Sequence, residues 1–183
     1  MKRFIMVLLF CLAMGMPLIV GAASYQLDTD HSSIQFKVRH LTVSNVTGTF
    51  NKFKGIAAVE GEDLATLKVE VAIDAASVDT GHEKRDEHLR NADFLDVAKY
   101  PTITFISKKI VKAEPGKLRI TGDLTLHGVT REITVDLEGP TPEVKDPWGN
   151  FRRGATGTAK IDRRDFGITW NKALDTGGLV VGN

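Results

Sequence analysis

Cysteine is nearly absent from this chain. Its 183 residues include one, Cys11, which lies inside an apolar run near the N-terminus. A disulfide framework is therefore excluded, and the rest of the chain has no thiol chemistry to offer. An excess of charge of one sign is also missing, since 24 basic residues stand against 23 acidic ones. Nothing in this balance indicates binding to nucleic acid or to an anionic membrane surface.

Long apolar runs are confined to the N-terminus. Lys2 and Arg3 precede the uncharged stretch FIMVLLFCLAMGMPLIV, and the small residues of GAAS follow it. This pattern predicts a secretory signal peptide over residues 1–22, export to the periplasm, and a mature domain over residues 23–183. A membrane-anchoring helix is the alternative, because the run approaches spanning length.

The mature chain alternates between apolar and polar residues with period two. Clear alternation occurs in SIQFKVRHL (33–41), LKVEVAID (67–74), TITFI (102–106), KLRITGDLTL (117–126) and EITVDLEG (132–139), and further strands are expected in VTGTFNKFKGIAAVE (46–60) and GATGTAKID (154–162). Such strands have one apolar and one wet face, as in antiparallel sheets. Gly128 in LHGVTRE is expected to form a tight hairpin link. Seven or eight short strands predict an all-β sandwich or barrel.

The stretch TGHEKRDEHLRNADF is the most charged part of the chain, and it is one residue short of the zinc signature HExxH. Asp86 stands where the second histidine is required. His82 and His88 are six residues apart and therefore lie on nearly opposite sides of a helix. The sequence therefore predicts no metal site here.

The same stretch is expected to form a short helix near residues 81–92, inserted between two strands as a cap or lid. Thr80 and Glu83 have the spacing of a capping box. Asp86 and Arg90 have the spacing of an i,i+4 ion pair.

Four linked stretches resemble the YceI-like family. They are DTDHSSIQFKVRHLTVSNVTGTFNKFKG (28–55), IDAASVDTGHEKRDEHLRNADFLDVAKYPTITF (73–105), ITGDLTLHGVT (120–130) and IDRRDFGITWNKAL (161–174), and the similarity runs from about Tyr25 to Gly182. The resemblance implies an antiparallel, up-and-down, lipocalin-like barrel of about eight strands, exported in bacteria. It also implies an elongated apolar cavity that binds a polyisoprenoid or similar lipid, with no cofactor, metal or catalysed reaction.

One departure from the family concerns the last strand. Family members usually continue past GLVVG into a further charged strand that closes the barrel, whereas this chain stops at Asn183. An incomplete barrel exposes unpaired backbone groups at two edges. The alternatives are closure by a second chain in a homodimer, a partly open barrel, or a truncated sequence.

The predicted cavity is lined by the apolar faces of the strands. Its residues are Ile34, Phe36, Val38, Val69, Val71, Ile73, Phe105, Leu124, Leu126, Ile168 and Trp170, with Phe50, Phe53 and Phe94 as further lining or at the mouth. The alternative for each is ordinary core packing. A long isoprenoid tail buries several hundred square ångströms, with a gross gain on the order of 10 kcal/mol before association costs.

Four polar residues are candidates for contact with a lipid head group: His31, Arg85, His88 and Asn171. The alternative for His31 is a turn-stabilising hydrogen bond, and that for Arg85 is an ion pair that fixes the helix to the barrel rim. Residues 162–165 (DRRD) are expected to form a structural charge cluster in which Arg163 or Arg164 pairs with Asp165.

Three function classes remain open at this stage. The first is a periplasmic lipid-binding protein that acts as carrier, store or sensor. The second is a hydrolase that uses a histidine with a carboxylate, although no G-x-S-x-G elbow occurs. The third is an adaptor subunit for a membrane redox or isoprenoid-quinone system.

Overall fold

The computed structural model describes residues 22–175 and 177–183. The predicted signal peptide lies outside these residues, apart from Ala22. The strands are β1 (Ala22–Gln26), β2 (Ile34–His40), β3 (Ser44–Phe50), β4 (Phe53–Glu60), β5 (Lys68–Asp74), β6 (Val78–Asp79), β7 (Thr102–Lys112), β8 (Lys117–Leu126), β9 (Val129–Glu138), β10 (Val144–Lys145), β11 (Phe151–Arg152) and β12 (Thr156–Thr158). The helices are α1 (Glu83–Arg90) and the 3₁₀ turns η1 (Leu64–Thr66), η2 (Ala75–Ser77) and η3 (Arg163–Phe166). Within the described ranges, no helix is long and apolar enough to cross a membrane.

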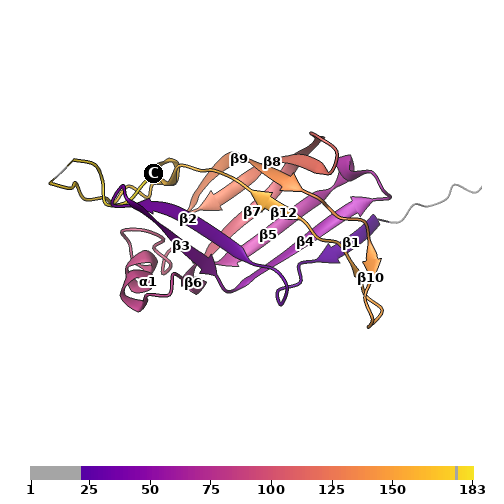
Figure 1. The fold of residues 1–183 in the computed structure, drawn as a ribbon, viewed down its shortest axis with the longest axis horizontal. Coiled ribbons are helices and arrows are strands. Elements are labelled where there is room, and N and C mark those ends of the chain that lie inside the picture. The colour runs from indigo at the N-terminus through magenta and orange to yellow at the C-terminus, as the bar shows by residue number, and fades with distance from the viewer. Residues whose placement is uncertain (1–21, 176) are drawn as a thin grey trace, which may run out of the picture.

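A curled antiparallel sheet forms the body of the molecule (Figure 1). Seven strands follow the order β1-β4-β5-β7-β8-β9-β12, and a second sheet has the order β2-β3-β6. The second sheet prolongs the first, because β3 leads into β4 and β5 leads through η2 into β6. The result is a half-barrel, which confirms the predicted all-β, antiparallel, lipocalin-like class with one inserted helix.

The wall of the half-barrel has a seam, defined here as the line between the β1/β2 edge and the β12 edge. Within residues 22–175 and 177–183, β1 pairs only with β4, and β12 pairs only with β9, over Thr156–Thr158. At one end of the seam the chain near the C-terminus is bound to β2, since Gly182 N donates to Arg39 O at 2.8 Å and Leu41 N donates to Val180 O at 2.8 Å. Figure 1 places this junction and α1 at one end of the molecule, and the β10–β11 hairpin at the other.

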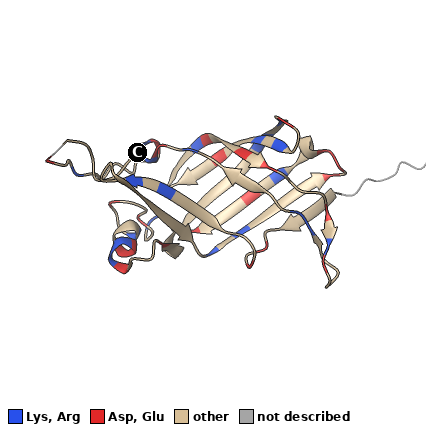
Figure 2. Ribbon diagram, in the orientation of Figure 1, with Lys and Arg blue, Asp and Glu red and all other residues tan. Residues whose placement is uncertain are grey.

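Period-two alternation translates into an inner apolar face and an outer polar face. The register keeps inner residues opposite one another, as in Phe53↔Ile73↔Ile103 and Ile120↔Val135. Lys, Arg, Asp and Glu are interspersed over the large sheet and over α1, although β2 and β7 contain basic residues and no acidic ones (Figure 2). The seven predicted segments all contain strands, whereas β1, β6, β10 and β11 were not predicted.

The β8–β9 hairpin forms as its sequence indicates. Leu126 pairs with Val129, and the two link residues, His127 and Gly128, have φ values of 52° and 72°. A Cβ at Gly128 would lie 2.3 Å from the Tyr100 ring. Glycine is therefore required here both for its positive φ and for the close approach of the ring.

Helix α1 lies within the predicted span but begins differently. Its N-cap is His82, whose ring accepts from Arg85 N, so the capping box on Thr80 is wrong. Asp86 is buried and accepts from Thr80 N at 2.9 Å and from Thr80 Oγ1 at 2.6 Å. Arg90 donates instead to Ala76 O and Val78 O, each at 2.8 Å, so the Asp86–Arg90 pair is wrong as well. The buried carboxylate of Asp86 thus binds the loop that precedes the helix. The i,i+4 spacing rule considers only contacts between side chains within a helix, so it could not predict this contact.

Two apolar clusters occupy the inner face. One gathers at the α1 end around Ala75, Phe94, Ile103, Leu126, Phe166 and Ile168. The other gathers around Ile110, Leu118 and Ile120, where β7 and β8 pair. The middle of the wall lies between them, and its side chains are considered next.

Candidate ligand-binding cavity

Most inner side chains of the half-barrel are only half-buried. Of the fourteen residues predicted to line the cavity, Phe94, Leu126 and Ile168 are buried at 7%, 8% and 5% exposure. The other eleven keep intermediate exposure, although alternation places the strand residues among them on the inner face. A sheet that packed a dry core would bury them, as protein interiors are close-packed. The inner face is therefore a concave apolar surface that the rest of the described chain covers incompletely.

Two glycines on the inner face leave room for aromatic rings to lie against the sheet. Gly48 is the register partner of Phe36, and a Cβ there would lie 2.4 Å from the Phe36 ring. A Cβ at Gly122 would likewise lie 2.7 Å from the Phe105 ring. Because the rings lie over glycines, they do not extend across the concavity, and larger residues would push them into it.

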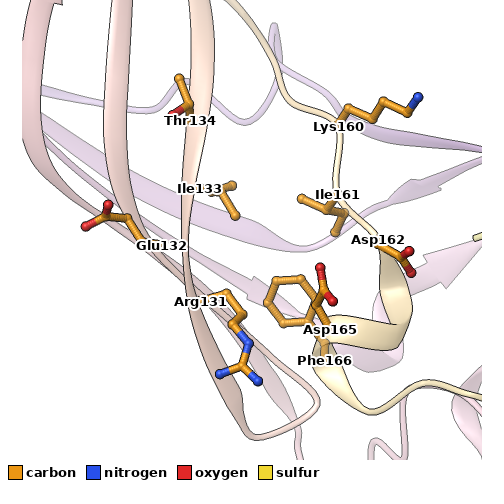
Figure 3. Close-up of a pocket in the computed structure, with 9 residues that line it drawn as sticks. All are labelled: Arg131, Glu132, Ile133, Thr134, Lys160, Ile161, Asp162, Asp165 and Phe166. Atoms are coloured by element: carbon orange, nitrogen blue, oxygen red, sulfur yellow. The ribbon is translucent and has the colours of Figure 1, made fainter.

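A slot opens between β9 and the segment that follows β12. Pairing between these strands ends at Thr158↔Asp136, so residues 131–134 of β9 have a strand partner only in β8. The slot has a volume of about 360 Å³ and is lined by Arg131, Glu132, Ile133, Thr134, Lys160, Ile161, Asp162, Asp165 and Phe166. Figure 3 shows Ile133 and Ile161 pointing toward each other across the slot, while Lys160 and Glu132 point away. The narrow part of the slot, its throat, is therefore lined by Ile133 and Ile161, and charged side chains lie around its opening, the rim.

Arg131 is a basic residue at the rim of the slot, and it lies on the inner side of β9. It is the register partner of Leu124 and precedes Ile133 and Val135 at period two. Its guanidinium is exposed and makes one long hydrogen bond, from Nη1 to Thr130 O at 3.4 Å. Arg131 was not among the residues predicted from the sequence. Its spacing of two residues from Ile133 could have indicated that it lies on the same side of the strand.

Three aromatic side chains meet where α1 approaches the wall. His88 packs edge-on against Phe94 and Trp170, each with ring centroids 4.9 Å away, and Phe94 and Trp170 lie 5.2 Å apart. His88 Nε2 also lies 2.9 Å from an Asp93 carboxylate oxygen. The structure thus brings together one predicted head-group residue and two predicted lining residues.

The other three head-group candidates lie elsewhere. His31 is 76% exposed at its side chain and lies 2.8 Å from Asp28 in the turn between β1 and β2. Arg85 donates from Nε to Thr80 Oγ1 at 2.7 Å, next to the buried carboxylate of α1. Asn171 donates to Val181 O at 2.6 Å and accepts from Val181 N, which joins two irregular segments near the C-terminus.

Arg163 fastens the seam at the α1 end. Its Nε donates to Gly182 O, and its Nη1 donates to Ile168 O and Trp170 O, all at 2.9 Å. Burial lowers the pKa of this guanidinium from its usual value, and the buried Nη2 has no hydrogen-bond partner among the described residues. The predicted pairing with Asp165 is therefore wrong for Arg163.

Arg164, the next residue, pairs with Asp162 at 2.5 Å. Hydrogen bonds from Arg164 hold the pKa of Asp162 at about 2. The predicted pairing with Asp165 is wrong for Arg164 as well. The charged residues 162–165 thus have structural roles, as expected. Arg164 stabilises the turn through Asp162, and Arg163 binds the chain near Gly182.

A second polar cluster fastens the seam at the opposite end. Arg152 donates to Asp146 at 2.7 Å and pairs with Asp28 beyond β1, and Tyr25 of β1 donates to Glu143. Asp146 also accepts from Asn150 Nδ2 and from the backbone N–H groups of Trp148 and Asn150 at 2.9–3.1 Å. These contacts, Arg152 first, hold the pKa of Asp146 well below its usual range.

This cluster predicts a defined acid response. The folded-state pKa of Asp146 lies below its unfolded value, so the stabilisation is fully present above about pH 4, the ordinary value for aspartate, and is lost as the pH falls toward the depressed pKa. In thermal unfolding from pH 7 to pH 2, we expect Asp146→Asn to have the lower Tm at neutral pH. The difference from the unsubstituted protein should shrink below pH 4. A difference that stays constant with pH would contradict the assignment.

Within the described residues, no three His, Cys, Asp or Glu side chains are grouped so that they could hold a metal ion. The histidine–carboxylate pairs His31–Asp28 and His88–Asp93 are present. In the same part of the chain, neither ring is hydrogen-bonded to a serine or threonine hydroxyl.

Comparisons with known proteins agree with this architecture. The model of the family described as YceI-like domain matches residues 25–183. A UPF0312 protein of Vibrio parahaemolyticus is 44% identical over 170 residues, which cover 92% of this chain and 89% of the relative. The crystal structure of Burkholderia cenocepacia BcnA is 25% identical, with a TM-score of 0.69 over 84% of this chain and 91% of that one. The Campylobacter jejuni YceI protein is 36% identical, with a TM-score of 0.61 over 78% and 83%.

Proposed function

The chain belongs to the YceI-like domain family, and from this premise we propose that it binds a polyisoprenoid or a similar long-chain amphiphilic lipid inside the half-barrel. The observation that carries the proposal is the incomplete burial of the inner apolar face between the two clusters. An apolar surface left open to water is costly unless something covers it. A flexible hydrocarbon chain fits such a surface because it needs no specific polar contacts along its length.

The slot supplies an entry from the side of the wall. Its throat is formed by Ile133, Ile161 and Phe166, and Phe166 belongs to the cluster at the α1 end. A tail that enters here passes directly onto the inner face. Arg131 at the rim then holds a phosphate, carboxylate or carbonyl oxygen of the head group, for which a guanidinium is suited.

The test is to purify the protein from its own host, extract it with organic solvent, and identify the bound molecules by mass spectrometry. We expect about one long-chain amphiphile per protein, with an anionic or carbonyl-bearing head group. Protein that carries no hydrophobic molecule, and that also fails to take up such lipids after purification, would contradict the proposal.

Export to the periplasm forms part of the same proposal. It rests on the basic residues Lys2 and Arg3, the apolar run and the small residues that follow it. The domain would then work outside the cytoplasm as a carrier, store or sensor of lipid. N-terminal sequencing of protein from its host would test this, with a mature chain that begins at Ala23 as the expected result.

A further inference from the structure

The β10–β11 hairpin exposes three large apolar side chains to solvent. We define the arm as residues 144–153, VKDPWGNFRR. Trp148 at its tip is 82% exposed, Val144 is 60% exposed and Phe151 is 58% exposed. Figure 1 shows the hairpin extending from the end of the half-barrel opposite α1.

The tip of the arm is held in a fixed shape. Asp146 accepts from the backbone N–H groups of Trp148 and Asn150, while Asp146 N donates to Asn150 O at 2.9 Å. Arg152 joins Asp146 to Asp28, which fixes the arm to the β1 side of the seam. Trp148 is therefore presented by an ordered turn, and little conformational freedom is lost when it binds something.

The apolar groups are arranged as a wedge. Val144 is the register partner of Arg152 and Lys145 that of Phe151, so Val144 and Phe151 lie on opposite faces of the hairpin, with Trp148 at the apex. A wedge does not match a flat protein surface. Three such side chains also offer only a few hundred square ångströms, below the roughly 800 Å² per partner of a stable protein interface.

A cation lies beside the wedge. The two arginines of the arm, Arg152 and Arg153, are paired with Asp146, Asp28 and Glu143, whereas Lys145 forms no ion pair among the described residues. Lys145 Nζ lies 5.7 Å from the centroid of the Phe151 ring, so a cation and an aromatic side chain are presented together. Tryptophan and phenylalanine beside lysine and arginine form the combination that settles at the boundary between head groups and acyl chains of a bilayer.

From these observations we infer that the arm inserts its tip into the surface of a lipid bilayer, with Trp148 as the anchor. The occupant is the bilayer interface itself. The inference rests on the proposed function for its purpose, because docking would hold the half-barrel at the membrane where lipid is collected or delivered. The docking step can be measured without any ligand in the half-barrel.

The experiment uses the fluorescence of the two tryptophans of the chain, Trp148 and Trp170. In the full domain carrying Trp170→Phe, all tryptophan emission comes from Trp148. Vesicles of phosphatidylcholine with phosphatidylglycerol should shift this emission to shorter wavelength, and brominated phosphatidylcholine in the vesicles should quench it. Unchanged emission on vesicles would overturn the inference, and this readout needs no substitution in the arm.

Co-sedimentation with the same vesicles gives a second readout. Trp148→Ser should weaken binding about tenfold, as expected for loss of one large buried apolar side chain. Val43→Ser is the matched control, because Val43 is 76% exposed in the β2–β3 turn, and it should leave binding unchanged. Equal binding by Trp148→Ser and the unsubstituted protein would overturn the inference.

Uptake of a fluorescent long-chain fatty acid in vesicle-free buffer separates the inference from the proposed function. Trp148→Ser should retain this uptake, which supports a role for the arm in docking alone. If the unsubstituted protein binds vesicles through Trp148 but takes up no fatty acid, the proposed function is overturned and the docking inference stands.

Discussion

Ala57→Phe is expected to lower the affinity for a long-chain lipid by about 30- to 100-fold. Ala57 lies in β4 opposite Val69 and Tyr25, and it keeps intermediate exposure on the inner face. A phenyl ring there would occupy the concavity between the two apolar clusters. Displacing roughly three methylene groups of a bound tail costs about 2.4 kcal/mol, which corresponds to this range.

Ala58→Phe is the matched control. Ala58 is the next residue of the same strand and points to the outer face, opposite Lys68 and Ser24. Titration of delipidated protein with a fluorescent fatty acid should show the loss for Ala57→Phe alone, while thermal unfolding confirms that both variants fold. Equal affinities of the two variants would place the ligand outside the half-barrel.

Arg163→Ala is expected to lower the free energy of unfolding by about 2–4 kcal/mol, the sum of three hydrogen bonds from a charged group less the relief of its burial. The guanidinium donates to the carbonyls of Ile168, Trp170 and Gly182. Gly182 in turn donates to Arg39 of β2. The substitution therefore releases the junction that fastens the seam beside α1, and the value follows from urea denaturation.

Arg164→Ala provides the comparison for this prediction. Arg164 is exposed, and its guanidinium pairs with Asp162, two residues away. Surface pairs of this kind contribute little, so the change should be much smaller than for Arg163→Ala. If the two alanine variants lose the same stability, Arg163 does not hold the seam.

Local patterns were sufficient to predict the longer strands and the helix. Alternation predicted strands over 33–41, 67–74 and 132–139, where Ile34–His40, Lys68–Asp74 and Val129–Glu138 form, because one face of each strand packs inward; the last begins three residues earlier than predicted. The short β10 and β11 were not predicted, since two residues are too few to show a period. Their hairpin is stabilised by Asp146 and Arg152, whose partner Asp28 is distant in sequence.

The candidate site was only partly predictable for the same reason. The inward direction of the strand residues followed from alternation, but the slot depends on where pairing between β9 and β12 stops, which no local pattern determines. Arg163 was assigned to the wrong partner because its acceptors are backbone carbonyls as far away as Gly182. Side-chain identity predicts a charge pair more readily than it predicts a contact with the main chain.

The location of the ligand tests the central claim most directly. In the Trp148→Phe variant, Trp170 is the remaining tryptophan, and it packs against the apolar cluster at the α1 end of the inner face. Titration with a brominated long-chain fatty acid should quench its emission and saturate near one ligand per protein, and Ala57→Phe should shift this titration to about 30- to 100-fold higher ligand concentration. Emission that is unaffected, or that falls without saturating, would contradict the account of a lipid held inside the half-barrel.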